Sequence, residues 1–271
     1  MATTKHADVN FKSGYSNANG LKIYYEIYGA GKPLVLIHGG GSTIETTFGR
    51  IIPQLSEHRQ LIAVELQAHG HTADVDRPET FEQDADDVAA VLKDLKIEHA
   101  DIFGFSNGGN TTMQIAMRHP GLVNKIILAS ALFKRDGMYP WFWESMPKAT
   151  LKDMPQPYHD AYLKVAPDPN NLVKMFEKDK NRMVEFKDWK AEDIRAINAP
   201  ALIIVGDQDV VRPEHAVEMY RLIPNSKLVI LPGAHGEYIG EITTLNNSNK
   251  NDFAIISIVE KFLDEQDKIK Q

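Results

Sequence analysis

Short apolar runs alternate along this chain with longer segments whose apolar residues recur every three or four positions. The run 201–205, Ala-Leu-Ile-Ile-Val, is apolar on both faces, as a strand buried inside a parallel sheet would be. Residues 79–95 instead place apolar side chains at helical spacing with acidic residues between them, which predicts an amphipathic helix. Strands and helices that alternate in this way predict an α/β protein with a mainly parallel sheet and helices on both faces.

The same pattern gives the order of the elements. Apolar and polar residues alternate over residues 10–29 around the sequence Asn-Ala-Asn-Gly, which predicts an antiparallel hairpin at the edge of the sheet. The strands predicted after it cover residues 32–37, 60–66, 101–105, 125–129, 201–205 and 228–231. The predicted helices cover residues 44–55, 79–95, 107–119 and 213–222.

The alternation stops between residues 133 and 190. This segment has no strand-like run, its prolines favour a series of short helices, and it is too long for a structureless loop in a compact domain. Two interpretations of its large apolar side chains stay open, because they would suit either the wall of an apolar pocket or the segment's own core. The residues concerned are Met138, Tyr139, Trp141, Phe142, Trp143 and Met146.

The sequence Gly104-Phe105-Ser106-Asn107-Gly108 joins the predicted strand 101–105 directly to the predicted helix 107–119. A serine in a strand-to-helix turn of this kind adopts a strained backbone conformation, and small residues two positions on either side prevent collisions with the neighbouring strand and helix. The turn exposes the serine hydroxyl above the sheet at the positive end of the helix. We therefore predict that Ser106 is a nucleophile.

A nucleophilic serine needs a base, an acid that orients the base, and backbone donors for the oxyanion. Three further strand ends offer such groups. The strand 32–37 runs into His38-Gly39-Gly40-Gly41, the strand 201–205 into Gly206-Asp207-Gln208-Asp209, and the strand 228–231 into Pro232-Gly233-Ala234-His235. With these motifs in the order serine, acid, histidine, the chain resembles the α/β-hydrolase superfamily from about Leu21 to Leu263, specifically its cap-bearing esterase, haloperoxidase and C–C hydrolase branch.

The resemblance implies an α/β-hydrolase fold with a mostly parallel, eight-stranded sheet, helices on both faces and an inserted helical cap. Residues 1–132 and 191–271 would form the core domain. Residues 133–190, where the alternation of strands and helices stops, would form the cap or lid.

The resemblance also implies a catalytic triad. Ser106 would attack the substrate, His235 would take its proton, and an aspartate would orient the imidazole. Asp207 and Asp209 both follow the strand 201–205. The family pattern places the acid three residues after the glycine, which favours Asp209 and leaves Asp207 to brace the loop.

Two backbone N–H groups would form the oxyanion hole, that of Gly40 and that of Asn107, the residue after the nucleophile. The Asn107 side chain departs from the apolar residue or glutamine common in relatives. His38 most resembles a brace beneath the oxyanion loop. His69 and His71 could suggest a metal pair, but no carboxylate or cysteine pattern accompanies them, so we expect no metal and no cofactor.

The composition and charge of the chain argue against some classes of binding partner. The chain of 271 residues has a net charge of −7 and no basic tract, which argues against nucleic acid or an anionic membrane as a partner. No apolar run approaches the length of a membrane span, and cysteine is absent, which excludes thiol chemistry. The first residues lack the apolar core of a signal peptide, so we expect a cytoplasmic protein, with a removed leader replaced by a new Met1 as an open alternative.

These features predict a serine hydrolase that cleaves small, apolar carboxylic esters through an acyl-enzyme. A serine at position 106, in place of aspartate, argues against the haloalkane dehalogenase and epoxide hydrolase branches. C–C bond hydrolases and cofactor-free haloperoxidases, or perhydrolases, share the same triad and remain alternatives. A ligand receptor that keeps the fold but does not turn over is a remote alternative of another class. The sequence leaves the natural substrate and the oligomeric state open.

Overall fold

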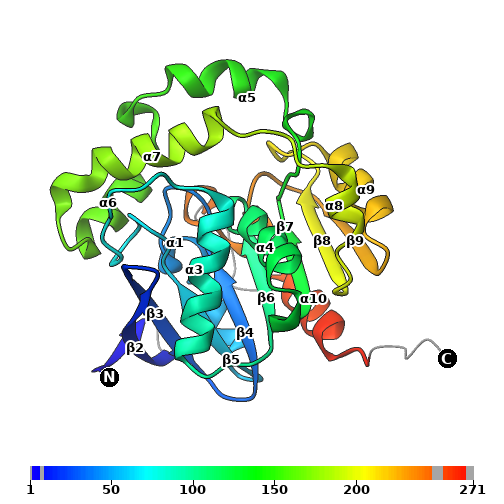
Figure 1. The fold of residues 1–271 in the computed structure, drawn as a ribbon, viewed down its shortest axis with the longest axis horizontal. Coiled ribbons are helices and arrows are strands. Elements are labelled where there is room, and N and C mark those ends of the chain that lie inside the picture. The colour runs from blue at the N-terminus through cyan, green and yellow to red at the C-terminus, as the bar shows by residue number, and fades with distance from the viewer. Residues whose placement is uncertain (1, 7–8, 246–252, 267–271) are drawn as a thin grey trace.

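The computed structural model describes residues 2–6, 9–245 and 253–266, and its centre is a nine-stranded sheet (Figure 1). The strand order is β1-β2-β3-β5-β4-β6-β7-β8-β9. The pairs β1–β2, β2–β3 and β3–β5 are antiparallel, and all other neighbours are parallel. The strands are β1 (Ala2–His6), β2 (Val9–Ala18), β3 (Leu21–Tyr28), β4 (Lys32–Ile37), β5 (Arg59–Val64), β6 (Ala100–Phe105), β7 (Val123–Ala129), β8 (Ala201–Gly206) and β9 (Ser226–Leu231).

The eight strands predicted from the sequence are confirmed as β2 to β9, and β1 is an addition at the antiparallel edge. In the predicted hairpin, β2 and β3 are joined by Asn19 and Gly20, which both have positive φ. This is the conformation that a tight two-residue hairpin turn requires, and asparagine and glycine adopt it most easily.

Helices cover both faces of the sheet, as the alternating pattern predicts. In β4, Val35 and Ile37 pack with α3, α4 and α9 on one face, whereas Leu34 and Leu36 pack with α1, α2 and α10 on the other. The α-helices outside residues 133–190 are α1 (Ile44–Phe48), α2 (Ile52–Leu55), α3 (Phe81–Asp94), α4 (Asn107–Arg118), α8 (Ala191–Arg195), α9 (Pro213–Leu222) and α10 (Ala254–Asp264) in the described part of the chain. Among the described residues, no helix is long and apolar enough to cross a membrane.

The prediction of one helix over residues 44–55 is wrong in one respect, because the structure divides it into α1 and α2. Gly49 follows the last residue of α1, and a glycine, which has no side chain, is unfavourable in the interior of a helix. Pro53 lies in the first turn of α2 and has no N–H to continue the hydrogen bonds of α1.

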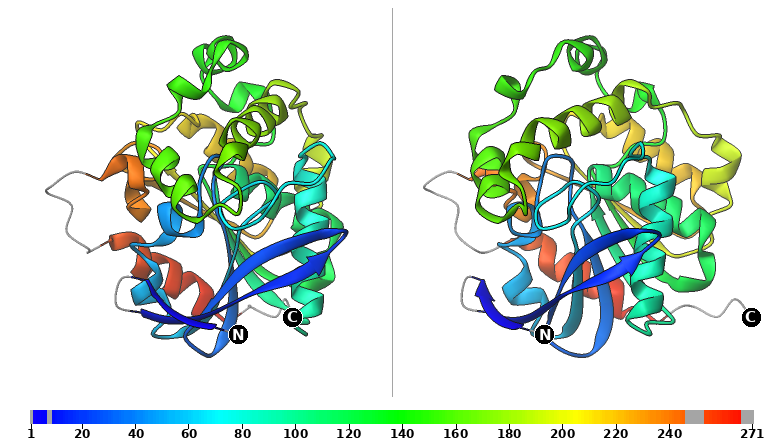
Figure 2. Two further views of the ribbon diagram at one scale, coloured as in Figure 1. Left: turned by 90° about the vertical axis from the view of Figure 1, so that its left-hand side faces the viewer. Right: turned by 60° about the vertical axis from the view of Figure 1, so that its left-hand side comes forward.

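Residues 133–190, which we call the inserted segment, contain helices and no β-strand. The segment lies over the end of the sheet at which the parallel strands finish (Figures 1 and 2). Its α-helices are α5 (Pro140–Ser145), α6 (Gln156–Val165) and α7 (Leu172–Val184), and its 3-10 helices are η2 (Arg135–Gly137), η3 (Met146–Lys148), η4 (Leu151–Asp153) and η5 (Pro169–Asn171). The described part of the core also contains the 3-10 helices η1 (Pro120–Leu122), η6 (Glu237–Ile239) and η7 (Ile242–Thr244).

Candidate active site

Ser106 occupies the sharp turn between β6 and α4, with φ 54° and ψ −121°. The flanking glycines are required by close packing. A Cβ atom on Gly104 would lie 2.0 Å from the carbonyl oxygen of Gly108, and one on Gly108 would lie 2.1 Å from that of Ile37. No side chain fits at either position, so the strained backbone of Ser106 is held by a strand, a helix and a neighbouring strand that approach each other directly.

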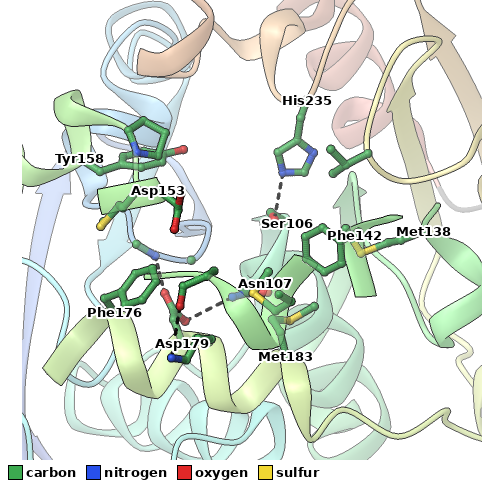
Figure 3. A pocket seen from close by; sticks show the side chains of 18 of the residues that line it. Ser106, Asn107, Met138, Phe142, Asp153, Tyr158, Phe176, Asp179, Met183 and His235 are labelled. Atoms are coloured by element: carbon green, nitrogen blue, oxygen red, sulfur yellow. Dashed lines mark hydrogen bonds between the residues drawn. The ribbon is translucent and has the colours of Figure 1, made fainter. Parts of the chain in front are cut away.

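Ser106, His235 and Asp209 form one chain of hydrogen bonds (Figure 3 shows its first link). The Oγ of Ser106 lies 3.1 Å from Nε2 of His235, and Nδ1 of His235 lies 2.7 Å from Oδ1 of Asp209. Because an ionised carboxylate can only accept, Nδ1 carries the proton and Nε2 is free to accept the serine hydroxyl proton. The arrangement can therefore activate a hydroxyl group as a nucleophile.

Four donors surround the Asp209 carboxylate. Besides His235, the Ser130 hydroxyl donates to Oδ2 at 2.5 Å, the N–H of Val211 donates to Oδ1 at 3.0 Å, and the N–H of Gly206 lies 3.4 Å from Oδ2. Burial would raise the pKa of Asp209, but His235 and these hydrogen bonds hold it below its ordinary value. Asp209 consequently stays ionised beside the imidazole.

The charge on Asp209 also changes the pKa of His235. Burial alone would lower the pKa of His235, but the Asp209 carboxylate and its hydrogen bond raise it above the ordinary value of 6.5. The imidazolium that forms when His235 takes a proton is thereby stabilised.

Asp207, the alternative acid, makes no hydrogen bond to the His235 imidazole. It is exposed, and its Oδ1 accepts from the N–H of Gly233 at 2.9 Å, which ties the loop after β8 to the loop after β9. The geometry agrees with the bracing role that the sequence assigns to it.

The backbone N–H groups of Gly40 and Asn107 lie near Ser106, and neither donates a hydrogen bond within residues 2–6, 9–245 and 253–266. Beneath them, Nδ1 of His38 donates to the carbonyl oxygen of Gly39 at 2.7 Å, while Nε2 accepts from the N–H of Leu66 at 3.1 Å. Burial and the neighbouring His69 lower the pKa of His38 to about 3. His38 is therefore a neutral brace between residues 39–41, which we call the glycine loop, and the end of β5.

His69 and His71 do not share a site. Nε2 of His69 contacts Asp179 at 2.9 Å, whereas Nδ1 of His71 contacts Glu65 at 2.9 Å and its ring stacks on Tyr24. Within the part of the chain that the structure describes, no group of three or more histidine or acidic side chains could hold a metal ion.

A cavity of about 360 Å³ opens over Ser106 between the core and the inserted segment (Figure 3). Three of the six apolar residues left open by the sequence line it, namely Met138, Phe142 and Met146. Tyr139, Trp141 and Trp143 do not: the side chain of Trp141 is 55% exposed, and Trp143 stacks on Arg135 and Phe186. Further apolar wall residues of the cavity are Leu132, Met154, Met175, Phe176, Met183 and Val211.

Two parts of the site were missed by sequence reasoning. Ser130 lies at the end of β7 with φ 51°, and Tyr238 lies 2.6 Å from its hydroxyl. Because Ser130 gives its only proton to Asp209, Tyr238 must donate to Ser130. Asp179 of α7 lines the cavity and accepts from the side chain of Asn107 at 3.3 Å. A lone serine after a strand and one acid in a charged helix carry no signal in the sequence.

Comparison with known proteins fits this geometry. A family model for the alpha/beta hydrolase fold matches residues 32–186, more than half of the chain. The chain therefore belongs to the α/β-hydrolase family.

Individual relatives differ in activity. The chain is 28% identical to a 2-hydroxy-6-oxo-2,4-heptadienoate hydrolase of Pseudomonas putida, over 82% of this chain and 88% of the relative. It is 25% identical to a non-heme chloroperoxidase of Kitasatospora aureofaciens, over 80% and 90% of the two chains. Among solved structures, a serine hydrolase involved in carbazole degradation superposes with a TM-score of 0.76 at 24% identity, over 93% and 98% of the chains, which shows a shared fold.

Proposed function

We propose that this protein is a serine hydrolase that cleaves small, neutral carboxylic esters through an acyl-enzyme. The observation that carries the proposal is the chain Ser106–His235–Asp209, with contacts of 3.1 and 2.7 Å. It opens into an apolar cavity beside two backbone N–H groups that donate to none of the described residues. Nucleophile, base, orienting acid and oxyanion donors are the components that acyl transfer requires.

In the proposed reaction, Ser106 Oγ attacks the ester carbonyl carbon while its proton passes to Nε2 of His235. The N–H groups of Gly40 and Asn107 bind the oxyanion of the tetrahedral intermediate. Collapse of the intermediate expels the alcohol, which takes the proton from His235 and leaves an acyl group on Ser106. Water then attacks the acyl group, His235 accepts the water proton and returns it to Ser106, and the carboxylic acid departs.

The charges around the cavity favour a neutral ester over an anionic substrate. Of the described residues that line the cavity, Lys180 is the only lysine or arginine, and it pairs with Glu177 at 2.5 Å. Arg182, on the same helix, is bound by Asp84 at 2.7 Å and by Asp179. A substrate carboxylate would therefore compete with protein carboxylates for both Lys180 and Arg182.

C–C bond hydrolysis is the second candidate, because the Pseudomonas relative that matches most of this chain bears the name of a dienoate hydrolase. Such a substrate carries a carboxylate, for which the cavity has no unpaired lysine or arginine among the described residues. A perhydrolase reaction would use the same nucleophile, and a receptor would bind without turnover.

We further propose that the inserted segment acts as a cap that selects the acyl group. Its support is the cavity wall, which takes Met138, Phe142 and Met183 from this segment and Ser106 and His235 from the core. The remaining expectations, a cytoplasmic location and neither nucleic acid nor a membrane as a partner, follow from the sequence alone.

A panel of p-nitrophenyl esters of rising chain length tests the proposal. It is run beside a vinylogous diketone that carries a carboxylate. We expect repeated turnover of the short esters, little cleavage of the anionic diketone, and no turnover of either by Ser106→Ala. Faster cleavage of the diketone than of any ester would favour the C–C hydrolase. Binding of esters without turnover would favour the receptor.

A further inference from the structure

Donors from four places in the fold converge on the carboxylate of Asp179, and Figure 3 shows the contact with Asn107. Its Oδ2 accepts from the backbone N–H of Gly41 and from Nε2 of His69 at 2.9 Å. Its Oδ1 accepts from Nδ2 of Asn107 at 3.3 Å and from the guanidinium of Arg182. All four acceptor positions of the carboxylate are thus occupied.

Two of these donors belong to the two arms of the proposed oxyanion hole. Gly41 directly follows Gly40, and Asn107 is itself the second arm. One carboxylate from the inserted segment therefore holds the glycine loop and the first residue of α4 at a fixed separation. A Cβ atom on Gly40 would lie 2.4 Å from Nδ2 of Asn107 and 3.0 Å from Oδ2 of Asp179, so the three groups are packed without space between them.

The charge on Asp179 is balanced inside this cluster. Burial would raise the pKa of Asp179, but His69 and Arg182 hold it well below its ordinary range. Arg182 in turn is 3% exposed and also bonds to Asp84 at 2.7 Å. Because two cations neutralise Asp179, it can remain close to the oxyanion hole as an ionised acceptor without strongly opposing negative charge on the substrate.

Gly41 has a second acceptor within reach. Nδ1 of His69 contacts the carbonyl oxygen of Gln67 at 2.7 Å and must donate to it, which leaves Nε2 either protonated or with a free lone pair. Beside Asp179 the cation is favoured, and its Nε2 donates to the carboxylate. Without Asp179, a neutral His69 could accept the N–H of Gly41 from its present distance of 3.2 Å. Which acceptor binds the N–H of Gly41, Asp179 or His69, thus depends on the packing of α7.

We propose that Asp179 is a positioning residue that couples the packing of α7 to the geometry of the oxyanion donors at Gly40 and Asn107. The inference rests on the proposed function, because it assigns Asp179 to the same acyl-transfer site. Asp179 does not touch the reacting atoms and acts through the glycine loop and the Asn107 side chain.

The test uses Asp179→Asn and Asp179→Ala, with kcat and KM for p-nitrophenyl acetate and the rate at which a fluorophosphonate labels Ser106. We expect kcat and the labelling rate to fall together by about tenfold or more, short of the hundredfold or greater loss of a whole donor, while KM changes little. Added formate should restore part of the rate to Asp179→Ala. The formate would occupy the space left by the missing carboxylate.

Glu177→Ala is the matched control, because Glu177 lies on the same helix and pairs with Lys180 but contacts neither Gly41 nor Asn107. We expect its kcat and labelling rate to equal those of the parent protein. If Asp179→Ala does not fold, as judged by circular dichroism, the isosteric Asp179→Asn carries the test.

Parent rates in a folded Asp179→Asn, or equal losses in Glu177→Ala, would overturn the inference. If the parent protein neither turns over esters nor labels at Ser106, the proposed function fails and the inference falls with it. Labelling at Ser106 that is unchanged in both Asp179 variants would refute the inference alone.

Discussion

Two histidine–aspartate pairs lie near the glycine loop, and they differ in what the second ring nitrogen contacts. In the pair His235–Asp209, at 2.7 Å, the second nitrogen faces Ser106 at 3.1 Å. In the pair His69–Asp179, at 2.9 Å, it faces a backbone carbonyl at 2.7 Å. The first ring can accept and return a proton, whereas the second can only hold one.

Position in the fold explains the difference. The side chain of His235 is 27% exposed and borders the cavity, and both members of its pair follow strands of the core. The side chain of His69 is 1% exposed, and its pair joins a core loop to helix α7 of the inserted segment. The same two residue types thus suit a base in one place and a fixed, charged contact in the other.

The largest effect should come from breaking the first pair with Asp209→Asn. The amide would misorient His235 and favour the wrong tautomer, and we expect kcat to fall by about 10⁴. Asp207→Asn is the control, because among the described residues the Asp207 side chain hydrogen-bonds only to the N–H of Gly233. We expect this variant to lose activity by no more than about tenfold. Steady-state kinetics with p-nitrophenyl acetate compare the two, and a larger loss in Asp207→Asn would exchange their roles.

A smaller loss should follow Ser130→Ala. This change removes a hydroxyl that donates to Asp209 at 2.5 Å, and a hydrogen bond to a charged group is worth about 1.5–3 kcal/mol. We expect the kcat of Ser130→Ala to fall by about tenfold or more. The kcat of Tyr238→Phe should fall less, because Tyr238 is one hydrogen bond further from Asp209. Parent kcat values in a folded Ser130→Ala would show that the other donors suffice to hold Asp209.

The second pair should be visible in the pH dependence of stability. Burial alone would lower the pKa of His69, but Asp179 raises it to about 9 in the folded protein, from the ordinary 6.5. The stability that the raised pKa of His69 contributes is therefore complete below pH 6.5 and lost as pH rises through 9, at up to about 1.4 kcal/mol per pH unit.

Burial also raises the pKa of nearby Glu79, and Asp209 raises the pKa of His235. Both groups therefore add to the loss of stability with rising pH. Asp179→Asn isolates the contribution of His69. Urea unfolding between pH 6.5 and 9 should show a flatter decline in this variant than in the parent. Identical slopes would mean that Asp179 does not hold the proton on His69.

The smallest effect concerns the cavity wall. Phe142 lines the cavity and Trp141 beside it is exposed, so Phe142→Ala should widen the range of acyl chains accepted while Trp141→Ala should not. We expect kcat/KM for longer p-nitrophenyl esters to rise relative to acetate by a few-fold, in line with the value of one or two methylenes in an apolar pocket. Equal selectivity in the two variants would remove Phe142 from the selecting wall.

The sequence predicts the core site because parallel strands end at the same edge of a sheet. Ser106, Asp209 and His235 each follow a run of apolar residues, so topology alone brings them together. Asp179 could not be predicted in this way. It lies in the run Glu-Lys-Asp-Lys-Asn-Arg, where an acid is indistinguishable from a solvent-facing one until α7 is packed against the glycine loop.

The inserted segment shows the same limit. Its helices follow from its prolines and its length, but which aromatic side chains face the cavity depends on how α5 rotates against the core. Phe142 and Trp141 are neighbours in sequence with opposite surroundings.

The central claim, that Ser106 is the nucleophile activated by His235, is tested most directly by covalent labelling. The parent protein and His235→Ala are treated with a fluorophosphonate, digested and mapped by mass spectrometry. We predict one labelled peptide that contains Ser106 in the parent protein, and labelling slowed by several orders of magnitude in His235→Ala. Labelling at another serine, or an equal rate at Ser106 without His235, would contradict the account.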